Sequence, residues 1–189
     1  MLRMLSVGPY QANCYILGNK NTRQGLIIDP GDEVIRIIKE VTKLELNIKY
    51  ILITHGHIDH VGGAKELKQI TKAPVLIHSL DEPGLGFDAD NHLSDGQEIT
   101  LGSYIIKVIH TPGHSPGGVC LSAPGAVFTG DTLFAGSIGR TDFPGGSHEQ
   151  LIKGVREKIF PLGDNIRVYP GHGPPSTIGR ERTVNPFFK

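Results

Sequence analysis

The sequence contains no tryptophan, only two cysteines and no excess charge of either sign, with 19 basic and 19 acidic side chains. Proteins that bind nucleic acid usually carry a basic stripe or a positive excess, so we expect no nucleic-acid partner. No apolar run approaches the roughly 20 residues that span a bilayer, and the first residues lack the apolar core of a signal peptide. We therefore expect no membrane association and a cytoplasmic location.

The two cysteines, Cys14 and Cys120, stand alone, without a second cysteine at metal-binding spacing. A free cysteine packs as a small hydrophobic residue, and disulfides are rare in reducing compartments. We expect both side chains to be buried and unpaired.

The chain has 189 residues, 38% of them hydrophobic, which is typical of one compact domain. Short runs rich in Val, Ile and Leu predict strands over 13–17, 25–29, 49–54, 74–78, 98–101, 104–110, 118–122, 126–129 and 167–169. Helices are expected after Asp32 as N-cap, over 63–70, over 147–158 behind the S-x-x-Q capping pattern, and after Thr177. Residues 81–96 are expected to form a long acidic loop. The alternation of strands and helices predicts a layered α/β or α+β fold.

One dense polar cluster follows the apolar run at residues 50–53: Thr54-His55-Gly56-His57-Ile58-Asp59-His60. Imidazoles and carboxylates are ligands of borderline divalent cations such as zinc. Core packing has no use for so many polar groups in one short segment, so the pattern predicts a metal site. The isolated His78, His92, His110 and His148 are expected to be ordinary surface or packed residues.

Three further candidate ligands, His114, Asp131 and His172, each follow an apolar run of their own. Pro-Gly pairs precede both histidines, and such pairs end strands and allow sharp turns. Sites in layered α/β proteins collect beyond strand ends, so we expect all seven side chains to meet. Seven ligands are too many for one tetrahedral ion and suit two ions that share a bridging carboxylate.

These motifs resemble the metallo-β-lactamase fold superfamily, and within it the hydroxyacylglutathione hydrolase (glyoxalase II) branch. The similar segments are 54–60, 111–114, 129–132 and 169–173. The resemblance implies a four-layer αβ/βα sandwich with a dinuclear site at the sheet rim. It implies a first metal bound by His55, His57 and His114, a second bound by Asp59, His60 and His172, a bridging Asp131, and Asp29 as a supporting carboxylate behind the ligands.

Two metals sharing a hydroxide provide a nucleophile at neutral pH. No Ser-His-Asp or Cys-His arrangement and no obvious general acid accompany them, which favours a good leaving group such as a thiolate. We therefore predict thioester hydrolysis, with Asp131 as the bridging ligand and Asp59 as a proton carrier. Zinc fits the ligands best, and iron and manganese also fit.

The segment Gly139-Arg140-Thr141-Asp142-Phe143 resembles the loop with which glyoxalase II contacts glutathione. Arg140 is a candidate for binding a substrate carboxylate, or else it pairs with Asp142 on the surface. Only 17 residues follow His172, so we expect a compact form without the C-terminal helical glutathione-binding domain. The expected partner is a small anionic thioester, and the sequence predicts no oligomeric state.

Other functions share these motifs. A persulfide dioxygenase would hold one iron with His55, His114 and Asp131. Lactonases, RNA-processing nucleases and a non-catalytic metal-binding domain are lower alternatives. Metallo-β-lactamases of the first class usually lack a histidine at the place of His60 and have cysteine at the place of Asp131, so we do not expect antibiotic hydrolysis.

Overall fold

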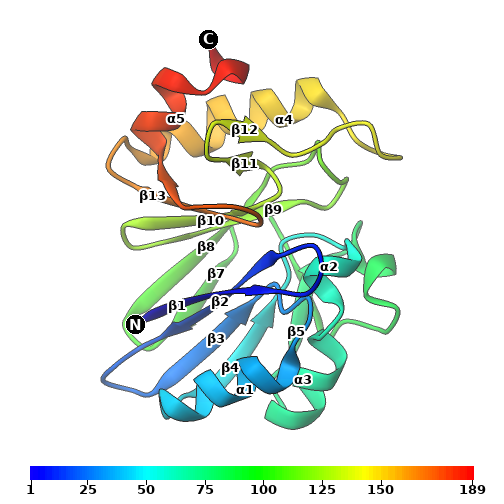
Figure 1. The fold of residues 1–189 in the computed structure, drawn as a ribbon, viewed down its shortest axis with the longest axis vertical. Helices are drawn as coiled ribbons and strands as arrows, with labels where there is room; N and C mark the ends of the chain where they lie inside the picture. The colour runs from blue at the N-terminus through cyan, green and yellow to red at the C-terminus, as the bar shows by residue number, and fades with distance from the viewer.

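Two six-stranded sheets lie face to face in the middle of the molecule, with helices on the outer side of each (Figure 1). The structure is a computed structural model that describes all residues from Met1 to Lys189. The order of layers, helices, sheet, sheet, helices, confirms the expected αβ/βα sandwich.

The strands of both sheets follow a mixed topology. In spatial order the first sheet consists of β1 (Leu2–Val7), β2 (Ala12–Gly18), β3 (Gln24–Ile28), β4 (Asn47–Leu52), β5 (Val75–His78) and β6 (Asn91–Leu93). The second consists of β14 (Ser176–Thr177), β13 (Arg167–Pro170), β10 (Ala126–Gly130), β9 (Val119–Ala123), β8 (Tyr104–His110) and β7 (Glu98–Leu101). A separate hairpin pairs β11 (Leu133–Phe134) with β12 (Ser137–Ile138). Neighbours from β3 to β6 are parallel, as are β10 and β13, and the other pairs are antiparallel.

The helices divide between the two outer layers (Figure 1). Under the first sheet lie α1 (Val34–Lys43) and α3 (Ala64–Thr71), and over the second lie α4 (His148–Gly154) and α5 (Ile178–Val184). The single-turn helix α2 (Ile58–Val61) lies at the end of the first sheet. A π-turn (Val155–Ile159) continues α4, and 3₁₀ turns cover Glu82–Leu85, Phe160–Leu162 and Pro186–Phe188.

Each strand near the middle of a sheet buries both of its faces. On β2, Cys14 and Ile16 pack toward α1 and α3, whereas Tyr15 packs between the sheets. On β9, Cys120 packs toward α4 and Leu121 packs between the sheets. Strands of a sheet that is covered on both faces have nearly continuous apolar sequences. This is why these strands could be predicted from the sequence. Both cysteines are buried and free, as expected.

Several local expectations are wrong. Asp32 is not the N-cap of α1, because Glu33 takes that position in a left-handed conformation, with φ 52°, and no side chain caps the helix. The strand β1 was not predicted, since its side chains are half exposed and lack an apolar run. Residues 81–96 are not one loop but contain a 3₁₀ turn and β6. The caps Ser147 and Thr177 are confirmed, each accepting a hydrogen bond from a backbone N–H at 3.3 Å.

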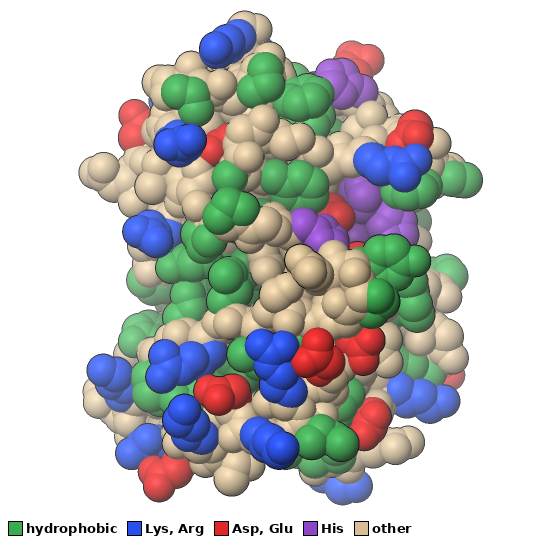
Figure 2. All heavy atoms as spheres, viewed as in Figure 1, with side chains coloured by type: hydrophobic (Ala, Val, Ile, Leu, Met, Phe, Trp, Pro, Cys, Tyr) green, Lys and Arg blue, Asp and Glu red, His purple; other side chains and the backbone are tan.

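The loops that follow β4, β8, β10 and β13 carry the predicted ligands to one rim of the sandwich. Histidine side chains gather at the surface there, between the two halves of the molecule (Figure 2). Separately, none of the helices has the length and apolar character needed to cross a membrane.

Candidate metal centre

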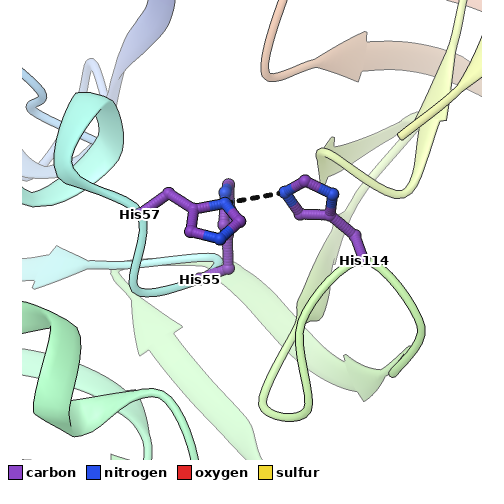
Figure 3. Close-up of side chains that lie close together, drawn as sticks. All are labelled: His55, His57 and His114. Carbon is purple, nitrogen blue, oxygen red and sulfur yellow. Dashed lines mark hydrogen bonds between the residues drawn. The ribbon is translucent and has the colours of Figure 1, made fainter. Parts of the chain in front are cut away.

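Three histidines converge from two different sheets in the first half of the cluster. His55 and His57 follow β4 of the first sheet, and His114 follows β8 of the second (Figure 3). The Nδ1 atom of His57 lies 2.8 Å from Nε2 of His114. One nitrogen from each of the three rings lies within 4.8 Å of the others. These side chains surround one common point, as expected.

The second half is built around α2. This helix carries Asp59 and His60, and His172 reaches them from the loop after β13. Nε2 of His172 lies 3.1 Å from Oδ2 of Asp59 and 3.3 Å from Nε2 of His60. The pattern of the sequence did not reveal this helix, because a single turn shows no periodicity.

Asp131 lies between the two halves. Its Oδ1 is 3.4 Å from Nε2 of His60, and its Oδ2 is 3.6 Å from Nε2 of both His114 and His172. A Cβ atom on Gly171 would collide with Oδ1 of Asp131, so glycine is required for this close approach. The carboxylate therefore has the position expected of a bridging ligand.

Buried hydrogen bonds behind the rings fix which nitrogen of each carries a proton. The hydroxyl of Thr54 donates to Oδ2 of Asp29 at 2.6 Å, so its oxygen is left to accept from Nδ1 of His55 at 3.1 Å. Nδ1 of His60 donates to the same Oδ2 at 3.0 Å. Nδ1 of His114 donates to the carbonyl of Arg140 at 2.8 Å. In the neutral form of each of these three rings the Nε2 lone pair is thus directed into the cluster, as metal ligation requires.

Two buried atoms in the cluster have no hydrogen-bond partner: Nε2 of His55 and Oδ1 of Asp131. An unpaired buried polar atom costs about 1–3 kcal/mol, so folded proteins rarely leave two side by side. Both atoms are acceptors and both face the other ligands. The donor set therefore fits divalent cations, which accept exactly such lone pairs.

The family comparison agrees with this geometry. The family model of the metallo-beta-lactamase superfamily matches residues 7–172. The chain belongs to this superfamily. The hydroxyacylglutathione hydrolase GloC of Haemophilus influenzae is 39% identical to it over 207 residues, which cover 99% of this chain and 97% of the relative.

Solved structures of superfamily members also superpose along the whole chain. BLEG-1, described as a B3 metallo-beta-lactamase, has a TM-score of 0.95 at 34% identity and covers 100% of both chains. ETHE1 from Myxococcus xanthus has a TM-score of 0.89 at 31% identity, covering 98% of this chain and 83% of its own. TTHA1623, solved in a di-iron-bound form, has a TM-score of 0.86 at 35% identity, and the match covers 98% of this chain and 99% of its own.

The two halves of this superfamily site differ in electrostatics. Burial, and then the neighbouring imidazoles, hold the pKa of His55 well below its usual range, and the pKa of His57 is also lowered. In the second half, burial opposes the charge of His60, but Asp131 and Asp29 outweigh it and raise the pKa to about 9. The hydrogen bond with Asp59 raises the pKa of His172. Burial also opposes the charge of Asp59, yet contacts with these two histidines lower its pKa to about 2.

The backbone of Arg140 contacts His114, and the side chain of Arg140 is paired within its own loop. Its Nε and Nη2 atoms donate to the two oxygens of Asp142 at 2.9 and 2.8 Å. Its guanidinium also lies 4.4 Å from the ring centroid of Phe143, and that ring is 5.1 Å from the ring of His57. The surface pair is therefore present, and it places a cation and an aromatic face together beside the first half.

Two buried polar residues near the site were not singled out from the sequence. Asp81 accepts hydrogen bonds from both loops of the first half, and Asn13 donates to the loop that carries His172. For Asn13 the available signal was an amide at the start of an apolar strand. Asp81 gave no comparable signal, because one aspartate in an acidic segment resembles solvated surface.

Proposed function

We propose that this protein is a two-metal hydrolase that cleaves small anionic thioesters, in the manner of glyoxalase II. The observation that carries the proposal is the convergence of seven candidate ligands, arranged as two triads around Asp131. The similarity to GloC along nearly the whole of both chains supports a hydroxyacylglutathione-type substrate.

Divalent metals, zinc in the first instance, supply a Lewis acid and lower the pKa of water toward ~7. His55, His57 and His114 would hold one ion, Asp59, His60 and His172 the other, and Asp131 both. Asp59 has a further role: its side chain is 20% exposed, and its carboxylate is the group proposed to carry the proton released during hydrolysis. A thiolate leaves without prior protonation, so no separate general acid is required.

Two hollows flank the candidate ligands. A groove of about 830 Å³ runs from Asp59 along the start of α1, and it is lined by more acidic than basic side chains. A smaller hollow of about 160 Å³ borders His57 and His114. An anionic thiol carrier is repelled by the acidic groove, so we place the carrier on the side of Arg140 and Phe143.

The second candidate is a persulfide dioxygenase, and the similarity to ETHE1 favours it. That reaction would use one iron held by His55, His114 and Asp131. It gives no role to the triad of Asp59, His60 and His172, which the chain retains with its ligand atoms within 4.8 Å of one another. For this reason we place it second.

The deciding experiment measures thiol release from S-lactoylglutathione by purified protein under anaerobic conditions, with the metals quantified. The matched variants are His172→Ala, in the cluster, and His92→Ala, an exposed histidine outside it. We expect two metals per chain, rapid release, loss of release in His172→Ala and full activity in His92→Ala.

Two parallel assays identify the alternatives. Oxygen consumption with glutathione persulfide and a single bound iron would replace the hydrolase by the dioxygenase. Cleavage of a chromogenic cephalosporin, prompted by the likeness to BLEG-1, would replace the thioester by a β-lactam. Two bound metals without turnover of S-lactoylglutathione, glutathione persulfide or the cephalosporin would contradict the thioester assignment. Lactones would then be the next substrates to test.

A further inference from the structure

We infer that Asp81 and Asn13 are positioning residues, each of which aligns the ligands of one metal and not of the other. The inference rests on the two-metal site of the proposed function. Each residue joins a ligand loop of one sheet to the facing sheet by hydrogen bonds of a single buried side chain. Neither contacts the reacting centre.

Asp81 joins the two loops of the first half. Its Oδ2 accepts from the backbone N–H of Gly56, which lies between His55 and His57, at 3.0 Å. The same oxygen accepts from the hydroxyl of Ser115, next to His114, at 2.6 Å, and Oδ1 accepts from the N–H of Gly117 at 2.6 Å.

The packing around Asp81 leaves no room for adjustment. A Cβ atom on Gly56 would collide with the carbonyl oxygen of Asp81, and one on Gly117 would collide with its carboxylate. Asp81 as a whole residue is only 6% exposed, so its carboxylate is hydrogen-bonded by these loops rather than by water. The spacing between the loops therefore depends on Asp81, and with it the approach of His57 to His114.

Asn13, at the start of β2, supports the loop of the second half as Asp81 supports those of the first. Its amide donates to the carbonyl of Pro170 at 3.0 Å and to that of Gly173 at 2.9 Å. Its backbone N–H donates to the carbonyl of Gly171 at 2.7 Å. These three acceptors lie on both sides of His172, and the side chain of Asn13 is 3% exposed. Asn13 thus fixes the loop that brings His172 to Asp59 and His60.

Because the two residues act on different ligands, their removal should separate the two metals. Loss of a group that orients a ligand typically weakens metal binding about 10–100-fold. Asp81→Asn keeps the shape of the side chain but replaces one carboxylate oxygen by an N–H₂ group, which cannot accept from the donors that contact Asp81. Asn13→Ala removes both amide donors. A residue that merely stabilised the fold would weaken both metals alike.

The test uses two backgrounds, each with one half disabled. In Asp59→Ala only the first half is intact, and in His57→Ala only the second. We expect Asp81→Asn to weaken zinc binding about 10–100-fold in the first background and to leave it nearly unchanged in the second. Asn13→Ala should show the reverse. Zinc affinity is measured by competition with a chromophoric chelator, and thermal unfolding of each metal-free variant is recorded beside it.

The milder Ser115→Ala and Asn13→Ser remove fewer hydrogen bonds and should show the same selectivity with smaller effects. They carry the test if the stronger variants do not fold. Equal weakening in both backgrounds, or none in either, would overturn the inference. Because the readout is metal affinity, a protein that binds two metals but cleaves no thioester still gives a decisive result.

Discussion

The first and second halves of the metal cluster lie on one scaffold but differ in the charge of their side chains. In the first half, His55, His57 and His114, burial lowers the pKa of His55 and His57, which favours the neutral form of these two rings. The second half, Asp59, His60 and His172, mixes a carboxylate with imidazoles whose pKa values are raised. His55 and His57 can therefore bind a cation without first losing a proton. In the second half, a cation must displace the ion pairs of Asp59 with His60 and His172.

The groups that accept hydrogen bonds from the outer nitrogens of the histidines also differ in charge between the two halves. The partner of His114 is the uncharged carbonyl of Arg140, whereas the partner of His60 is the buried carboxylate of Asp29. A carboxylate behind a histidine raises its basicity and holds its orientation. The charge of the second half is therefore set by the residues behind the candidate ligands as much as by the ligands themselves.

Asp131→Ala should have the largest effect, because this residue belongs to both halves. Several kcal/mol of transition-state stabilisation from a bound metal correspond to about 10³-fold in rate. We expect hydrolysis to fall by about that factor and metal content to fall from two to one or fewer. Elemental analysis with a rate measurement checks this, and Asp88→Ala on the exposed loop is the control. Unchanged activity would exclude the bridging role.

Asp29→Asn should separate the halves by its effect on His60. Asp29 has a φ of 51°, a left-handed conformation that asparagine tolerates, so this variant changes the charge while sparing the backbone. We expect binding of the second metal to weaken about 10–100-fold and that of the first to change less. Titration with zinc in the His57→Ala and Asp59→Ala backgrounds measures both, and equal losses would contradict the comparison.

The convergence of the seven candidate ligands could be predicted from the sequence because they are concentrated at strand ends. The cluster at residues 54–60 and the residues His114, Asp131 and His172 all follow apolar runs, and parallel strands bring such ends to one rim. The sandwich could be predicted for a related reason, since strands buried on both faces give unmistakable apolar runs.

Among the supporting groups, Asp81 and Asn13 could not be found in this way. Asp81 binds Gly117, 36 positions along the chain, and Asn13 binds Pro170 and Gly173 at separations of 157 and 160. Contacts of this range depend on how the two sheets pack, and neither residue has a local pattern. The N-cap of α1 was missed because Glu33 takes that position, where its side chain pairs with Arg36 and accepts a hydrogen bond from the N–H of Gly8.

The pH dependence of metal binding should also divide the halves. Protonated imidazole competes with the cation, and the pKa of His60 is about 9 in the metal-free protein. Affinity at the second half should therefore rise with pH, about tenfold per unit for one displaced proton between pH 7 and 9. The first half should be flat over this window, because the pKa values of His55 and His57 are lowered from 6.5. Titrations at pH 7, 8 and 9 in the single-site backgrounds check this; parallel slopes would contradict it.

The smallest effect is expected outside the ligands, at Arg140. Its pair with Asp142 is exposed, with side chains 66% and 67% accessible, so water and salt screen it strongly. If Arg140 contacts the anionic thiol portion of the substrate, Arg140→Ala should raise KM about fivefold and leave kcat nearly unchanged. Asp142→Ala frees the guanidinium and should lower KM. Both shifts should shrink at high salt, since exposed charges lose their interaction there. A change in kcat alone would instead assign the pair to holding Phe143 beside His57.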